Sequence, residues 1–272
     1  MHPAVESAPV VRSAWRALRS GEHLSDKLGI AARLAIYTLF PVGSLARRLG
    51  HPLPDPTRLL GEVTVRGQAG VFVCPPGPGA FFLGVGEAYE PRLSAVLRET
   101  RGTVVDVGAN VGFITVRAAR VASQVIAIEP HPIRFRYLKR NVALNGLRNV
   151  TCINCAVGAA EGEIALYDVD PSLGPRPLDV SATPGRGRCY RVPLRALDSL
   201  VQEADLIKID VEGYEAEVLR GATNLLAGRP RLVVEALAGP ALVAELLDGY
   251  SLQELDAHTY LAIESPAKHD AP

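Results

Sequence analysis

One carboxylate and a glycine-bracketed turn come together in the stretch TVVDVGANVG, residues 103–112. Asp106 stands just before Gly108 at the end of a β-branched run, where its carboxylate can accept hydrogen bonds or face a positive charge. Gly108 and Gly112 let the backbone bend sharply and approach a ligand closely, while Asn110 tolerates a left-handed conformation. These residue types predict a ligand-binding turn that favours a cationic ligand group.

Glu129 ends the next β-branched run, 23 positions after Asp106. This spacing is near the roughly 20 residues at which an acidic side chain on the second strand of a βαβ unit binds ribose hydroxyls. A dinucleotide site would carry G-x-G-x-x-G, and Asp106 would repel its pyrophosphate. S-adenosyl-L-methionine has a ribose, an ammonium and a sulfonium, so we expect it as the cofactor. A nicotinamide dehydrogenase is the less favoured enzyme class.

Lys208, Asp210 and Glu212 form an alternating ionisable row in DLIKIDVEG, residues 205–213. Alternation along a strand puts all three on one face. Charges on a buried strand are costly unless they are paired or take part in chemistry. We expect Asp210 or Glu212 to remove a proton from a methyl-accepting hydroxyl, and Lys208 to keep one carboxylate ionised. The alternative is a salt bridge from Lys208 that only holds the sheet together.

The elements that must position these side chains are typical of an open, doubly wound α/β fold. Apolar runs without alternation indicate strands covered on both faces, and helical patterns separate them. We predict a mostly parallel, Rossmann-like sheet that binds its ligand at the carboxyl ends of the strands, with an antiparallel hairpin at one edge. The predicted strands are residues 103–107, 124–129, 150–157, 206–211 and 231–237, followed by the edge runs 251–255 and 259–263.

The third predicted strand, residues 150–157, contributes to the expected cofactor site. Its carboxyl end carries Asn154 and Ala156, which suit contacts to the adenine ring. Cys152 and Cys155 form a C-x-x-C pair in the same run, but no second pair stands at a useful spacing. We therefore interpret both cysteines as buried apolar side chains and assign no metal.

The helix after Glu129 begins next to His131, which we interpret as a turn residue rather than a catalytic group. Its apolar positions face inward, and its arginines are expected on a solvated face rather than at a nucleic-acid site. A later segment, residues 192–201, carries leucines at helical spacing and is predicted to be helical.

Three parts are predicted along the chain. Residues 1–60 form a helical appendage, residues 61–100 form a β-hairpin and a lead-in helix, and residues 101–265 form the S-adenosylmethionine-binding domain. The run PPGPG, residues 75–79, is expected to be the hairpin turn. The helix that begins at Pro91 leads into the first core strand.

The segment of residues 12–48 is rich in arginine and contains a short apolar run. That run is too short and too interrupted to span a bilayer. It suits an amphipathic helix with its arginines in water, which either packs over the active site or makes peripheral contact with a membrane.

Two other segments are expected near the substrate. Glu87, Tyr89 and Glu90 precede the lead-in helix and should lie at the mouth of the crevice. The Pro-, Gly- and Arg-rich run of residues 168–189 is long for a loop, and long loops in compact enzymes are often functional. We expect it to cover the substrate.

The composition is that of a globular protein, with 48% hydrophobic and 21% charged residues among 272. The 29 basic and 29 acidic residues give no net charge, so we expect no nucleic-acid partner. Four cysteines do not form a disulfide framework, and no secretory signal pattern opens the sequence, so a cytoplasmic location is expected. The sequence does not predict an oligomeric state.

Five motifs resemble, in order and spacing, the FkbM family of S-adenosylmethionine-dependent methyltransferases. They lie within residues 85–240 and read VVDVGANVGFIT, AIEPHP, LKRNVALNGLRNV, NCAVG and DLIKIDVEGYEAEVLRGA. The resemblance implies a class I methyltransferase fold and an active-site role for Asp210 and Glu212. It implies cofactor contacts for five further residues, namely Asp106, Gly108, Asn110, Gly112 and Glu129.

One feature departs from the family pattern. Many members carry a histidine or another polar residue after the fifth-strand glutamate, whereas Ala236 and Leu237 follow Glu235 here. A histidine base at that point is therefore not expected. Asp210, Glu212 and Glu235 leave a metal possible, but no ligand set typical of catechol-type enzymes follows the fourth strand.

The resemblance also bears on the acceptor. It suggests a hydroxyl of a sugar, a glycan or glycolipid, or a polyketide-like metabolite, so we expect an O-methyltransferase. A catalytically silent methyltransferase fold that serves as a binding module is the alternative from another class. The ionisable residues at two strand ends argue against it.

Overall fold

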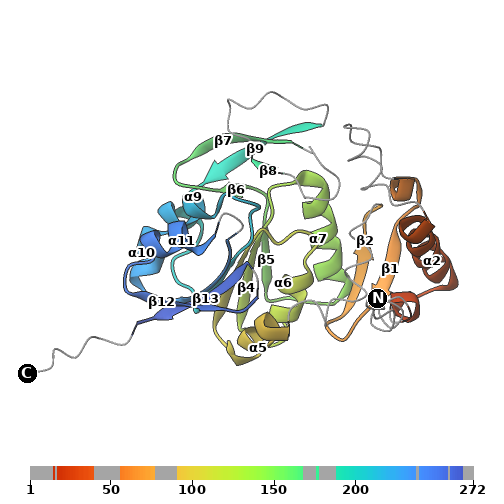
Figure 1. Cartoon of the computed structure of the whole chain (residues 1–272), viewed down its shortest axis with the longest axis horizontal. Coiled ribbons are helices and arrows are strands. Elements are labelled where there is room, and N and C mark those ends of the chain that lie inside the picture. The colour runs from red at the N-terminus through yellow and green to blue at the C-terminus, as the bar shows by residue number, and fades with distance from the viewer. Residues whose placement is uncertain are drawn as a thin grey trace, which may run out of the picture.

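The structure is a computed structural model of the chain (Figure 1). It describes residues 15, 17–39, 56–76, 91–167, 176–177, 188–236, 239–256 and 258–265. The predicted mouth residues Glu87, Tyr89 and Glu90, most of the 168–189 loop and parts of the 12–48 segment lie outside the described residues.

A seven-stranded sheet in the order β12-β13-β11-β10-β3-β4-β5 forms the centre of the molecule. Its parallel strands are β3 (Thr103–Val107), β4 (Gln124–Ile128), β5 (Val150–Ile153), β10 (Leu206–Ile209) and β11 (Arg231–Glu235). Its antiparallel edge hairpin consists of β12 (Tyr250–Glu254) and β13 (Thr259–Glu264). This topology confirms the predicted doubly wound, mostly parallel α/β fold.

The order of the strands reverses at β3, because β4 pairs with one side of it and β10 with the other. Open α/β sheets bind ligands beyond the carboxyl ends of the strands at such a switch point. The register of β3 against β10 also places Lys208 opposite Asp106. Two ionisable side chains that are about one hundred positions apart in the chain thus become neighbours.

Helices cover both faces of the sheet, as the apolar strands require (Figure 1). One layer contains α5 (Pro91–Glu99), α6 (Phe113–Ala118) and α7 (Pro132–Leu144). The other contains α8 (Leu197–Leu200), α9 (Glu215–Arg220), α10 (Thr223–Ala227) and α11 (Pro240–Leu246). Alternation along β3 sends Val105 and Val107 toward the second layer and Val104 toward the first.

A second sheet, in the order β6-β9-β7-β8, corrects two predictions. Its strands are β6 (Ala156–Val157), β7 (Gly162–Tyr167), β8 (Arg176–Pro177) and β9 (Cys189–Arg195). The predicted strand of residues 150–157 is divided, because β5 pairs with β4 whereas β6 pairs with β9. The predicted helix of residues 192–201 was wrong in its first half, since β9 continues through Leu194 in pairing with β7.

The described residues of the N-terminal part include α2 (Leu24–Leu39), η1 (Pro56–Leu59), β1 (Val63–Arg66) and β2 (Val71–Cys74). The strands β1 and β2 form the predicted antiparallel hairpin. Its turn is GQAG, residues 67–70, rather than PPGPG, which follows β2. Among the described helices, none is long and apolar enough to cross a membrane.

Arg33 of α2 corrects the expectation that the arginines of this helix lie in water. Its side chain is buried, and its guanidinium donates to the carbonyl oxygens of Gly29, Leu60 and Gly61. Buried Asp26 accepts a hydrogen bond from the backbone of Thr64 on β1. Polar contacts therefore join α2 to the hairpin, because buried charges require partners.

Two asparagines of α7 attach the hairpin to the main domain. Asn141 accepts from the amide of Val73 and donates to the Val73 and Val111 carbonyl oxygens. Asn145 makes the same two-way contact with Val71. These side chains bond to the edge of β2 and hold the hairpin beside α7. No described residue of the appendage lines the pocket, although the appendage was expected to pack over the active site or to contact a membrane.

Candidate active site

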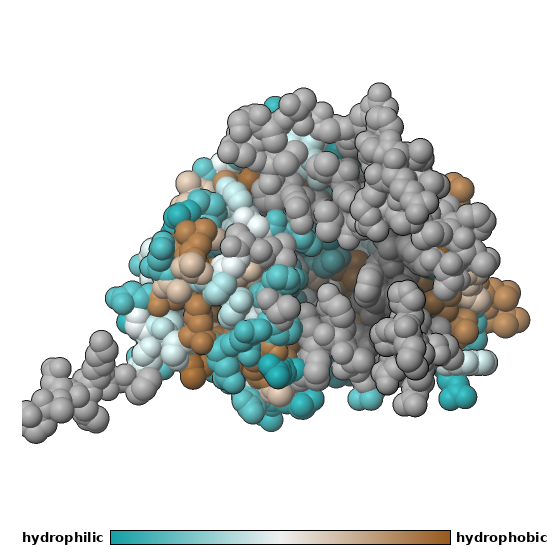
Figure 2. Space-filling view, viewed as in Figure 1, coloured by the Kyte–Doolittle hydropathy of each residue, from teal (hydrophilic) through white to brown (hydrophobic). Residues whose placement is uncertain are grey.

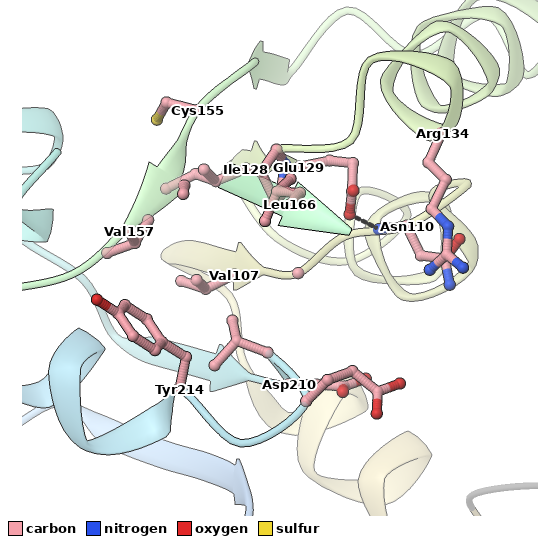
Figure 3. A pocket seen from close by; sticks show the side chains of 15 residues that line it. Val107, Asn110, Ile128, Glu129, Arg134, Cys155, Val157, Leu166, Asp210 and Tyr214 are labelled. Carbon is pink, nitrogen blue, oxygen red and sulfur yellow. Dashed lines mark hydrogen bonds between the residues drawn. The ribbon is translucent and has the colours of Figure 1, made fainter. Parts of the chain in front are cut away.

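A pocket opens beyond the carboxyl ends of β3, β4 and β10, where the switch point predicts a ligand site (Figure 3). Its apolar end is formed by Cys155, Val157 and Tyr214, and Glu129 lies near its middle. Asn110, Arg134 and Asp210 lie toward the opposite, charged end. Glu212 is a further charged residue that lines this pocket.

The turn after β3 is shaped by residues with positive φ. Gly108 has φ 78°, and an added Cβ would overlap the carbonyl oxygen of Asp210, so a glycine is required where β3 approaches the end of β10. Asn110 has φ 53°, in the left-handed region that asparagine tolerates. Gly108 and Asn110 both line the pocket. Gly112 instead contacts α7, where its Cβ would lie 2.7 Å from a methyl group of Leu138.

Glu129 is buried at the end of β4 and lines the pocket. Its Oε2 accepts the amide of Asn110 at 2.8 Å, and its Oε1 accepts the amide of His131 at 2.9 Å. Burial raises the pKa of this carboxyl, while the charge of Arg134 and the two amide hydrogen bonds oppose the rise. Because each oxygen accepts a single backbone hydrogen here, a lone pair on each is available to a ligand hydroxyl.

Asp106 lies beneath the pocket rather than in its lining. Its side chain is completely buried, and its Oδ2 accepts the hydroxyl hydrogen of Thr115 at 2.6 Å. Its Oδ1 has Lys208 Nζ at 3.4 Å and no hydrogen-bond partner. The predicted contact of Asp106 with the cofactor stays a prediction, and its position is that of a charge below the ligand.

Lys208 of β10 connects this strand to the turn after β3. Its Nζ donates to the Gly108 carbonyl oxygen at 3.1 Å and lies 3.2 Å from Oδ2 of Asp210. The ion pairs of Lys208 with Asp106 and Asp210 are the salt bridge that was given as the alternative in the sequence analysis. Lys208 is buried and does not line the pocket, so the geometry describes a group that positions carboxylates.

Asp210 has a second partner that the spacing did not reveal. It follows β10 directly, one residue after the pair of Ile209 and Val234, and Glu235 likewise follows Val234 at the end of β11. Burial, the hydrogen bond to Asp210 and the Asp210 and Glu212 charges raise the pKa of Glu235 to about 9, so its carboxyl donates to Asp210 at neutral pH. For Asp210 burial acts to raise the pKa, but Lys208 and the Glu235 hydrogen bond outweigh it and lower the pKa.

Glu212 and Asp210 both line the pocket, so the structure brings the two predicted catalytic carboxylates together. Glu212 has φ 56° and is followed by Gly213 with φ 101°. Left-handed conformations at non-glycine residues cluster at functional sites. This turn leads into α9, where Glu215 accepts the Gly213 amide at 2.7 Å.

The third strand contributes to the site differently from the prediction. Ala156 lines the apolar end of the pocket together with Leu166 of β7. Asn154 does not line it, because its amide donates to the carbonyl oxygens of Glu129 and Pro130 and fixes that turn. Cys155 lines the pocket as a buried thiol whose pKa burial raises to about 11. All four cysteines are free.

Arg134 and Tyr214 are among the lining residues that were not predicted from the sequence. Arg134 was placed on a solvated face, yet it stands in the first turn of α7, next to the strand end that carries Glu129. Tyr214 follows the Glu212 turn and was not predicted as a site residue. The position of Arg134 close after the strand end was the available signal. His131 acts as the N-cap of α7, which agrees with its interpretation as a turn residue.

No group of three or more histidine, cysteine or acidic side chains suited to a metal ion occurs within the described ranges. Asp210, Glu212 and Glu235 therefore do not form such a group. Asp210 and Glu235 face each other through a hydrogen bond instead.

Comparison with known families identifies the class of this domain. Residues 106–257 match the Methyltransferase FkbM domain. The matched segment is more than half of the chain and contains Asp106, Glu129, Asp210 and Glu235. The chain belongs to the FkbM methyltransferase family, as its motifs indicated.

The curated relatives it resembles are methyltransferases. It is 30% identical over 151 residues to the hexuronic acid methyltransferase AglP of Haloferax volcanii, an alignment that covers 52% of this chain and 59% of AglP. It is 29% identical over 153 residues to the methyltransferase sdnD of Sordaria araneosa, covering 43% of this chain and 59% of sdnD. The chain thus spans about three fifths of the length of these relatives.

Among solved structures, the chain resembles an FkbM methyltransferase from Methylobacillus flagellatus. The TM-score is 0.47 and the sequence identity 16%, over 95% of this chain and 60% of that one.

Proposed function

We propose that this protein is an S-adenosylmethionine-dependent O-methyltransferase that acts on a hydroxyl of a small molecule or glycan. One observation carries the proposal. A single pocket at the switch point has an apolar end, the Glu129 carboxylate near its middle, and Asp210 and Glu212 at its charged end. An adenosine with a cationic tail has the same sequence of properties.

The residues present fit this cofactor. Lone pairs on Glu129 can accept the two ribose hydroxyls, and the apolar surface of Ala156 and Leu166 suits a flat ring. Asp210 supplies negative charge for the ammonium and the sulfonium. Asp106 adds a fully buried charge below them, paired with Lys208. Gly108 keeps the turn free of a Cβ at its closest approach to β10.

The mechanism assigns separate roles to the two pocket carboxylates. When bound, S-adenosylmethionine supplies an activated methyl group, so the protein mainly aligns the acceptor and removes its proton. Asp210, whose pKa is lowered and which is held by Lys208 and Glu235, is a weak base and suits the binding of a cation. Glu212 is therefore proposed as the base that takes the hydroxyl proton as the oxygen bonds to the methyl carbon.

The acceptor class rests on the family and on AglP, whose name states that it methylates a hexuronic acid. We propose a sugar or another polyhydroxylated metabolite. The zero net charge of the chain supports a partner other than nucleic acid. A cytoplasmic location and the three-part division at residues 60 and 100 stay predictions.

Peripheral membrane contact through the N-terminal helix is part of the proposal. Leu24 and Leu28 stand four positions apart on α2 and are 73% and 63% exposed, and Trp15 is 61% exposed. Figure 2 displays this apolar surface at the edge of the molecule formed by α2. Exposed apolar groups on an amphipathic helix favour interfacial binding, and Lys27 adds a positive charge beside them.

Calorimetric titration with S-adenosylmethionine, S-adenosylhomocysteine and NAD tests the proposed function. We expect binding of the two adenosyl ligands and none of NAD, because the turn lacks the pyrophosphate fingerprint. Substitution of Glu129 by Gln should weaken adenosyl binding by about 10-fold or more, since hydrogen bonds to a charged acceptor are lost. Failure of the wild-type protein to bind either adenosyl ligand would refute the proposal.

A further inference from the structure

Among the described residues that line the pocket, acidic side chains outnumber basic ones. Three are carboxylates, namely Glu129, Asp210 and Glu212. Among the described lining residues, Arg134 is the single cation. Lys208 is close by but buried beneath the pocket, where it pairs with Asp106 and Asp210.

Arg134 is held at the pocket by the start of α7. Its backbone amide lies 3.4 Å from Nδ1 of His131, the N-cap of the helix. From this first turn the side chain extends to the charged end of the pocket, beside Asn110 (Figure 3). Its positive charge acts on two pocket carboxylates, because it acts to lower the pKa of Glu129 and of Asp210.

We infer that Arg134 binds a carboxylate of a ligand in this pocket. The inference rests on the proposed function, because the charges of the cofactor support it. S-adenosylmethionine carries two positive groups and one carboxylate. In the proposed function Asp210 matches the positive groups, Glu129 the ribose hydroxyls and Glu212 the acceptor, so none of the three pocket carboxylates matches the carboxylate of the cofactor. A guanidinium matches a carboxylate in shape and charge, and can donate two parallel hydrogen bonds to it.

Two ligands can supply this carboxylate. One source is the amino-acid end of the cofactor, which would lie at the same end of the pocket as Asp210. The other is an acidic acceptor, such as a sugar acid, that enters next to Glu212. The chemistry of recognition is the same in both cases, so the two sources are separated by the choice of probe.

Calorimetry on the full chain with Arg134→Gln tests the inference, with Arg136→Gln as the matched control. Arg136 stands on the same helix but is exposed and does not line the pocket. The probes are S-adenosylhomocysteine and 5′-methylthioadenosine, which shares the adenosine and thioether but lacks the amino acid. If the cofactor is the source, Arg134→Gln weakens S-adenosylhomocysteine by at least about 10-fold and leaves 5′-methylthioadenosine unchanged.

If an acidic acceptor is the source, both adenosyl probes bind Arg134→Gln as they bind the wild type. Titration of the protein saturated with S-adenosylhomocysteine then shows glucuronate binding that Arg134→Gln loses and Arg136→Gln keeps, whereas glucose shows no difference between the variants. Unchanged binding of every probe by Arg134→Gln overturns the inference alone. A wild type that binds neither adenosyl probe overturns the proposed function and the inference together.

Discussion

At the scale of single residues, the fold places carboxyl groups that look alike in the sequence in different surroundings. Glu129 accepts two backbone amides, Asp210 is held by Lys208, and Glu235 is kept protonated beside Asp210. Glu212 lines the pocket from a left-handed turn. In the proposed mechanism, environment more than residue type therefore separates the carboxylate that binds cations from the one that removes a proton.

Glu212→Gln is expected to lower kcat by about 100- to 10,000-fold, because an amide cannot take the proton of the acceptor. The Kd of S-adenosylhomocysteine should change less than about 3-fold, since Glu129 and the apolar end remain. Steady-state kinetics and calorimetry measure the two effects. The exposed Glu203, at the opposite end of β10, provides the control Glu203→Gln. Equal loss of turnover and cofactor affinity would place Glu212 among the cofactor contacts instead.

Glu235 predicts a dependence of stability on pH. Its pKa rises from an ordinary 4.5 to about 9 in the folded protein, so between these values the folded state holds a proton that the unfolded state has released. This contribution to stability is complete below pH 4.5 and is lost as the pH rises toward 9. Asp210, whose pKa is lowered in the folded protein, contributes to stability with the opposite pH dependence. Its contribution is present above its ordinary pKa of 3.8 and is lost as the pH falls below that value.

Urea unfolding at pH 5.5 and 8.5 tests this dependence in the wild type and in Glu235→Gln. Glutamine can still donate to Asp210 but does not titrate, so the variant should lose about 1–2 kcal/mol less than the wild type over this interval. Equal losses in both proteins would show that Glu235 does not carry the proton.

At the scale of elements, the site depends on how closely β3 and β10 approach. Gly108 touches the end of β10, and Lys208 donates to its carbonyl oxygen from the neighbouring strand. The turn after β3 is connected to Glu129 through the Asn110 amide. A shift of one strand relative to the other would therefore displace both the carboxylates and the turn.

Gly108→Ala is expected to destabilise the fold by about 3 kcal/mol or more, because the new Cβ overlaps the Asp210 carbonyl oxygen and φ is positive. Gly67→Ala is the matched control, since no atom lies within 4 Å of its added Cβ. Chemical unfolding of the two variants measures the difference. A similar stability for both would mean that the strands can separate at little cost.

At the scale of the whole molecule, the pocket and the apolar surface of α2 lie on different sides of α7 (Figure 1). The pocket opens at the carboxyl ends of the parallel strands, while the hairpin and α2 lie on the far side of α7 (Figure 1). Asn141 and Asn145 join these parts through the edge of β2. The apolar surface of α2 is thus presented by a structured element attached to the catalytic domain.

Sedimentation with vesicles tests this surface. The wild type is expected to sediment with vesicles that contain anionic lipid, and Leu24→Ser combined with Leu28→Ser should reduce the bound fraction by several-fold, because buried apolar area drives interfacial binding. Leu144→Ser is the control, since Leu144 is an exposed leucine at the end of α7 and is not part of α2. Equal sedimentation of all three proteins would assign α2 another role.

The sequence by itself determined the family, most strands and helices of the main sheet, and the glycine turn after its first strand. Apolar period, glycine position and the spacing from Asp106 to Glu129 are local properties, and the strand pairing around β3 confirms the predicted doubly wound sheet. The division of residues 150–157 into two strands was not predicted, because one apolar run can pair with strands of two different sheets.

Only the tertiary structure decided how the charges pair. Lys208 meets Gly108 from one hundred positions away, Glu235 meets Asp210 from the neighbouring strand, and Arg134 enters the pocket from a helix face that was interpreted as solvated. Such contacts depend on strand order and register, which bring distant segments together. No window of local sequence contains that information, because burial and the partner of a charge belong to the folded chain.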